Sequence, residues 1–127
     1  MNGKLLNTIF GFAAIVGIMG FIAYQSKLAK DAKCNPPPGV VFFYGVTCPH
    51  CKNVEKYFDE ENVRQKYNFK ELEVYNDKNN RQMLTEAAKC CQMDVTKIGV
   101  PFLWTAEKTC VTGDQPIIDY FKNKLAQ

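Results

Sequence analysis

The tetrapeptide Cys48-Pro49-His50-Cys51 constrains the fold of this 127-residue chain more than any other feature of its sequence. It comes directly after the apolar run 40–44, whose continuous hydrophobic character is typical of a buried strand. Apolar residues at helical spacing follow it, and Pro49 suits the first turn of a helix, where no N–H is needed. Two cysteines at such a strand-to-helix junction predict a thiol redox site.

The two cysteines are expected to have different roles. A thiolate in the first turn of a helix is stabilised by unpaired backbone N–H groups and by the positive end of the helix dipole. We therefore expect Cys48 to be the nucleophile and Cys51 the resolving thiol, with their disulfide as the redox group and no separate cofactor. His50 is expected to favour the Cys48 thiolate when it is protonated or donates a hydrogen bond. The alternative is an exposed helix residue with no effect on the sulfur.

Residues 39–127 are predicted to form one α/β domain with the element order βαβαββα. Apolar spacing predicts these elements in chain order: a strand at 40–45, a helix at 49–66, a strand at 69–75, a helix at 76–91, and strands at 100–104 and 109–112. A last helix follows Gly113 and Asp114, with Pro116 in its first turn.

The N-terminal quarter of the chain is predicted to lie outside this domain. After a short tail at 1–4, residues 5–24 form an apolar run without a charged side chain, long enough to span a bilayer. An uncleaved membrane anchor is favoured over a cleaved signal peptide, because the run is long and no small-x-small cleavage site follows it. The Lys- and Pro-rich segment 25–38 is predicted to be a tether between the bilayer and the domain.

The charge distribution argues against a nucleic acid partner. The formal net charge of +3 lies entirely within residues 1–33, where four lysines outnumber the single Asp31, and residues 34–127 are balanced. A neutral domain lacks the basic surface that phosphate backbones require. The lysines that flank the apolar run suit lipid headgroups.

The six cysteines bear on the compartment. All of them lie outside the apolar run, and this density is more usual in oxidising compartments. We therefore expect a single-pass membrane protein with an extracytoplasmic C-terminal domain. A simple count of lysines on the two sides of the anchor favours the opposite orientation.

Four cysteines outside the tetrapeptide are possible structural disulfide partners: Cys34, Cys90, Cys91 and Cys110. A disulfide from Cys110 to either Cys90 or Cys91 is the first choice, because vicinal pairing is sterically awkward. Cys34 would then tie down the tether. The alternative is that some of them are ordinary buried cysteines.

The cysteine pair at its strand-to-helix junction, the element order and the downstream Gly99-Val100-Pro101 together resemble the thioredoxin superfamily in its compact, glutaredoxin-like form. The resemblance implies a three-layer α/β/α domain with a four-stranded mixed sheet. It also implies that Pro101 follows a cis peptide bond and faces the cysteine pair, and that the backbone of Val100 pairs with an extended substrate peptide. We expect Tyr44 and Thr47, which precede the pair, to contact substrate as well.

Some positions depart from the patterns of individual relatives. The Pro-His pair and the valine before proline are similar to Dsb-type periplasmic thiol oxidases, but the long helical insertion of that family is missing. Phe42 stands where thioredoxin has a buried carboxylate. Gly45 and Thr112-Gly113 stand where glutaredoxins commonly have a lysine and a Gly-Gly pair, so the glutathione-binding residues are incomplete.

The function expected from these features is that of a membrane-anchored thiol-disulfide oxidoreductase, acting as an oxidant or isomerase. Its partners would be cysteine-containing proteins, a membrane or soluble redox partner that recycles it, and the lipid bilayer. One alternative is a metal-handling protein that carries copper or zinc on the same thiols, although adjacent Cys90 and Cys91 would chelate zinc poorly and no metal is expected. A noncatalytic interaction module is the other.

Overall fold

The computed structural model describes residues 34–127, and the compact unit within it runs from Cys34 to Gln127. The predicted tail, the predicted membrane anchor at 5–24 and the tether up to residue 33 lie outside the described residues. Between residues 34 and 127, no helix is long and apolar enough to cross a membrane.

The domain is built on a four-stranded mixed sheet with the strand order β2-β1-β3-β4. The strands are β1 (Val41–Tyr44), β2 (Lys70–Glu73), β3 (Phe102–Trp104) and β4 (Cys110–Thr112). β1 pairs in parallel with β2 and antiparallel with β3, and β3 pairs antiparallel with β4. The central position of β1 explains its uninterrupted apolar sequence, since both of its faces are covered.

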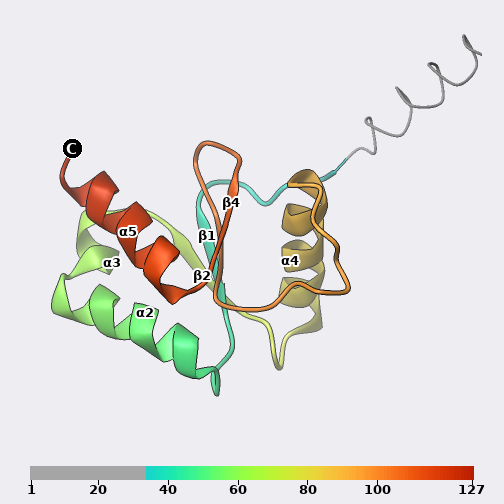
Figure 1. The fold of residues 1–127 in the computed structure, drawn as a ribbon, viewed down its shortest axis with the longest axis horizontal. Helices are drawn as coiled ribbons and strands as arrows, with labels where there is room; N and C mark the ends of the chain where they lie inside the picture. Colours follow the sequence, from blue (N-terminus) through green and yellow to red (C-terminus); the bar gives the residue numbers. More distant parts are fainter. Residues whose placement is uncertain (1–33) are drawn as a thin grey trace, which may run out of the picture. The chain divides into compact units, whose positions relative to one another are not determined.

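Helices cover both faces of the sheet (Figure 1). One face packs against α2 (Pro49–Glu60), α3 (Val63–Lys66) and α5 (Asp114–Leu125), and the other against α4 (Lys78–Cys90). Successive strand residues point to opposite faces, so Phe42 and Leu103 enter the first core while Phe43 and Phe102 enter the second. This mixed α/β arrangement is compatible with a thioredoxin-like fold.

Two predicted elements differ from the structure. The single helix predicted at 49–66 is divided into α2 and α3, because Asn62 adopts a left-handed conformation with φ 54°. The strand predicted to open at Val100 begins instead at Phe102. Pro101 has no N–H to donate to a neighbouring strand, so regular pairing starts after it.

Two disulfides join the end of α4 to other parts of the domain. Cys91 pairs with Cys110 on β4, and Cys90 pairs with Cys34, with Cα–Cα distances of 6.1 Å and 5.1 Å. Pro37 is buried, so the chain that leads from Cys34 into β1 lies against the domain. The structure thus decides which cysteine pairs with which, a choice that the sequence left open.

Candidate functional site

The Cys-Pro-His-Cys segment lies where β1 gives way to α2. Cys48 is the N-cap residue of α2, and Pro49 occupies its first turn. The backbone N–H of Cys48 donates to the carbonyl of Gly45 at 3.0 Å, which closes the turn between strand and helix. The turn therefore places the Cys48 sulfur at the N-terminus of the helix, where a thiolate is stabilised.

The two cysteines of this segment are the free thiols among residues 34–127. Cys48 keeps 6% of its surface exposed and Cys51 keeps none. The Cys48 sulfur accepts a hydrogen bond from the Cys51 N–H at 3.4 Å. Only the first cysteine is therefore open to a reactant, and the backbone of the second supports its sulfur.

The Cys51 thiol is strongly held in its protonated form. Burial, followed by a hydrogen bond with Cys48, raises the pKa of Cys51 to about 12. A thiol of this kind can donate to a neighbouring thiolate but does not compete with it as a nucleophile at neutral pH. The assignment of Cys48 as the nucleophile and Cys51 as the resolving thiol stays a prediction.

Val100 and Pro101 meet the cysteine pair from a distant part of the chain. The Val100–Pro101 peptide is cis, the conformation that the resemblance implies. The Cys48 thiol donates to the Val100 carbonyl at 3.5 Å, across 52 positions of sequence. Pro101 is buried while Val100 is partly exposed, and the backbone before the proline borders the Cys48 sulfur.

His50 forms a polar cluster with two residues that the sequence did not single out for this role. Its Nδ1 lies 3.1 Å from Oδ2 of Asp114, and the Asn53 side-chain amide donates to the same oxygen at 2.8 Å. The hydrogen bond from Asn53 has the largest effect and that with His50 the next largest, and they lower the pKa of Asp114 to about 2. Asp114 is thus ionised at neutral pH.

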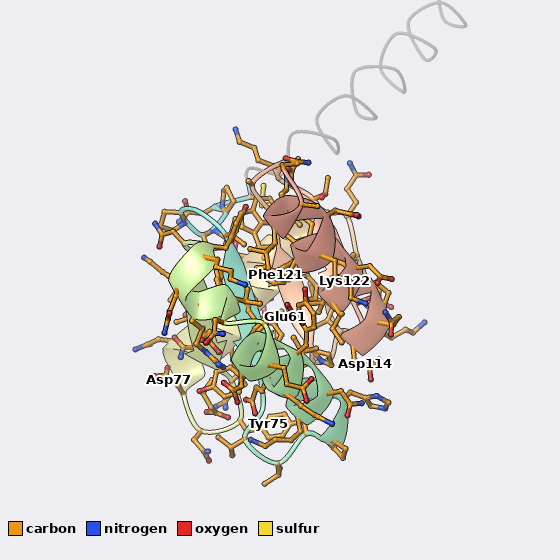
Figure 2. All side chains as sticks on the ribbon, turned by 90° about the vertical axis from the view of Figure 1, so that its left-hand side faces the viewer. Glu61, Tyr75, Asp77, Asp114, Phe121 and Lys122 are labelled. Atoms are coloured by element: carbon orange, nitrogen blue, oxygen red, sulfur yellow. A yellow bond between two sulfur atoms is a disulfide. The ribbon has the colours of Figure 1, made fainter. Side chains whose placement is uncertain are left out.

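Asp114 was predicted only as part of a helix start. In the structure Gly113 is the N-cap of α5 and Asp114 is its first residue, which suits a carboxylate. Nothing in the sequence indicates that this helix start faces the start of α2, 64 positions earlier. The labelled Asp114 side chain can be followed in Figure 2.

Two grooves meet at Val100. The first has a volume of about 240 Å³ and is mainly apolar; its lining residues are Val74, Tyr75, Arg81, Leu84, Thr85, Val95, Ile98, Gly99 and Val100. The second has a volume of about 340 Å³; its lining residues are His50, Met93, Lys97, Ile98, Gly99, Val100, Pro101, Thr112, Gly113 and Asp114. The two grooves share the segment from Ile98 to Val100.

The other two predicted substrate contacts lie elsewhere. Tyr44 is half-buried and stacks on Phe42, with ring centroids 6.0 Å apart, in the core beneath α2. Thr47 is exposed in the turn before Cys48. Neither residue lines either groove at Val100, whereas Tyr75, which the sequence suggests only as a strand residue, lines the first.

The described part of the chain offers no evident metal centre. Within residues 34–127, no group of three or more His, Cys, Asp or Glu side chains is placed to hold a metal ion. Four of the six cysteines are occupied in disulfides. Cys48 and Cys51 are free thiols three positions apart, an arrangement that is capable of thiol-disulfide exchange.

Comparison with known proteins does not assign this chain to a family. No protein-family model matches the sequence, and no curated protein matches it. The interpretation of the site therefore depends on its own residues and their geometry.

Proposed function

We propose that this protein is a membrane-anchored thiol-disulfide oxidoreductase of the thioredoxin superfamily, with a compact glutaredoxin-like domain. Its substrates are cysteine-containing proteins, and it acts as an oxidant or isomerase. One observation carries the proposal: Cys48 is a free, slightly exposed thiol at a helix N-terminus, 3.5 Å from the Val100 carbonyl beside a cis-proline, with fully buried Cys51 behind it.

The chemistry conserves sulfur and electrons at each step. The Cys48 thiolate attacks one sulfur of a substrate disulfide, forms a mixed disulfide and releases the other substrate sulfur as a thiolate. Cys51 then gives up its proton and attacks the Cys48 sulfur, which releases the remaining substrate thiolate. The protein is left with a Cys48–Cys51 disulfide and the substrate has gained two electrons.

The same steps in reverse oxidise a substrate dithiol, and this is the direction that we favour. A site that stabilises its reduced form is the stronger oxidant. The Cys51 N–H and the helix N-terminus both favour a negative sulfur at Cys48. Asp114 engages Nδ1 of His50, so Nε2 is the ring nitrogen available to the sulfur or to substrate.

The proposed location is the membrane, with the domain outside the cytoplasm. Two disulfides in a small domain suit an oxidising compartment. The uncharged run at 5–24 suits a single membrane span, and a membrane or soluble redox partner would restore the oxidised state.

The decisive experiment is a redox titration of the full chain in detergent. Glutathione buffers set the potential, and mass spectrometry after thiol alkylation reports the state of each cysteine. We expect Cys48 and Cys51 to change together while the other four cysteines stay paired. The Cys48→Ser variant should lose exchange with a reduced, unfolded test protein, and Cys51→Ser should accumulate a mixed disulfide. A wild-type pair that shows no coupled oxidation, or that retains a metal instead, would refute the proposal.

A further inference from the structure

Tyr75 is unusually exposed for a large aromatic residue. Its exposed fraction is 48%, and the other exposed large hydrophobic residues in the described part of the chain are Val46 and Val95. Val46 lies in the turn before Cys48, while Tyr75 and Val95 line the apolar groove that reaches Val100. Of these three residues, Val46 is therefore close to Cys48 in sequence, and Tyr75 and Val95 share the groove that reaches Val100.

The ring of Tyr75 lies directly against the turn that holds Cys48. A Cβ atom added at Gly45 would overlap three carbons of the Tyr75 ring, so the absence of a side chain at position 45 makes room for it. Gly45 is also the residue whose carbonyl receives the Cys48 N–H at 3.0 Å. Gly45 thus contacts both residues: its Cα side faces the Tyr75 ring, and its carbonyl binds the Cys48 N–H. Tyr75 is labelled in Figure 2.

The backbone that carries Tyr75 is held by side chains on both sides. The Glu73 carboxylate accepts the N–H groups of Tyr75 and Asn76, at 2.7 Å and 2.8 Å. Arg81 donates to the carbonyls of Val74 and Tyr75, both at 2.8 Å. Four hydrogen bonds therefore fix a segment whose aromatic side chain is half open to solvent.

The hydroxyl of Tyr75 is suited to donate rather than to ionise. Burial raises the pKa of Tyr75, and the neighbouring charge of Cys48 raises it further. The O–H group consequently stays protonated at neutral and mildly alkaline pH. It remains a donor over the range in which thiol-disulfide exchange proceeds.

We propose that Tyr75 is a catalytic residue of this site, whose hydroxyl donates a hydrogen bond to the Cys48 thiolate. This inference rests on the proposed function and adds a residue to it. Tyr75 forms and breaks no covalent bond: it stabilises the negative sulfur in the reduced protein and when Cys48 leaves a mixed disulfide. The phenol thereby makes the Cys48–Cys51 disulfide a stronger oxidant.

The test compares Tyr75→Phe with Tyr57→Phe in the full chain. Both variants remove one hydroxyl and keep the ring, but Tyr57 lies on α2 beside Lys122, away from the cysteines. A hydrogen bond to a charged group contributes roughly 1.5 kcal/mol or more. In Tyr75→Phe the equilibrium constant for oxidising glutathione should therefore fall about tenfold, which corresponds to about 30 mV. Tyr57→Phe should match the wild type.

A second readout does not depend on exchange activity. The pH profile for alkylation of Cys48 should move to higher pH in Tyr75→Phe and stay in place in Tyr57→Phe. Gly45→Ala tests the same hydrogen bond in a second way, because the added methyl group displaces the Tyr75 ring from the turn. It should shift the profile in the same direction, and adding Tyr75→Phe to it should have little further effect.

An alkylation profile in Tyr75→Phe that coincides with the wild type would overturn the role of the hydroxyl, whether or not the protein exchanges disulfides. Coupled oxidation of Cys48 and Cys51 with an unchanged equilibrium constant in Tyr75→Phe would overturn it while leaving the proposed function intact. If the wild-type pair did not oxidise but the alkylation profile of Tyr75→Phe were shifted, the exchange function would be refuted. The hydrogen bond from Tyr75 to Cys48 would still stand.

Discussion

At the residue scale, Cys48 and Cys51 show how position within one helical turn gives two identical side chains different environments. Cys48 caps the helix and keeps a small exposed area, whereas Cys51, three positions later, points into the domain and is fully buried. Burial keeps the second sulfur protonated, and the helix N-terminus favours a negative first sulfur. In the proposed mechanism, the order of attack follows from this difference.

Asp114 allows a test of the polar cluster at the same scale. Its pKa lies at about 2 in the folded protein against 3.8 ordinarily, so its ionisation stabilises the fold above pH 3.8. That contribution should disappear as the pH falls to about 2. Asp114→Asn should be less stable than the wild type near pH 6, and the two should converge at the acid end. Urea unfolding across this range measures the difference, and a gap that is constant with pH would contradict it.

At the element scale, α4 acts as a link between separate parts of the domain. Its last residue, Cys90, and the residue that follows, Cys91, bond to different partners. Neighbouring helical residues point about 100° apart, so adjacent cysteines can reach Cys34 on one side and Cys110 on the other. The segment after Cys91 leads to Val100, so one disulfide anchors the start of the loop that borders the Cys48 sulfur.

Removing the Cys91–Cys110 bond tests this link. Its cysteines are 19 positions apart, and a closed loop of this size stabilises a fold by about 3 kcal/mol in the chain-entropy description. Cys91→Ala with Cys110→Ala should lower the free energy of unfolding by about this amount, as measured by urea denaturation. The matched pair Cys34→Ala and Cys90→Ala opens a longer loop, with a separation of 56, and should cost about 4 kcal/mol. Unchanged unfolding in the first double variant would contradict the assignment.

At the scale of the whole domain, β1 contributes side chains to two hydrophobic cores, which pack against different helices. Phe42 packs with Phe58, at a centroid distance of 5.2 Å, on the α2 side. Phe43 packs with Phe102, at 6.0 Å, on the α4 side. Both phenylalanines are fully buried. Loosening either core therefore weakens the strand on which the other depends.

Phe42→Ala and Phe43→Ala should each lower the free energy of unfolding by about 3 to 5 kcal/mol, the range for large buried aromatic residues. Each variant should still unfold in one transition, because the cores share β1. Fluorescence of the single Trp104, in the α4-side core, and far-ultraviolet circular dichroism should then report the same midpoint. Val95→Ala, at an exposed position, serves as the control and should change little. Two separate transitions in Phe42→Ala would show that the cores unfold independently.

The sequence by itself indicated most of the elements and the cysteine pair of the proposed site. A continuous apolar run marks the central strand, and Pro49 between two closely spaced cysteines marks a helix start, because both are local properties of the chain. The division of the first helix at Asn62 escaped prediction, since the apolar spacing continues through it.

Only the tertiary structure decided which distant groups meet. The pairing of Cys91 with Cys110, the approach of Asp114 to His50 and the packing of Tyr75 on Gly45 depend on how helices are laid on the sheet. Local sequence patterns indicate the chemistry of a residue, but the fold determines which distant residues contact it and change its properties. For this protein the sequence indicated Cys48 as the candidate nucleophile, and the structure placed the Tyr75 ring against the turn before it and Asp114 against His50.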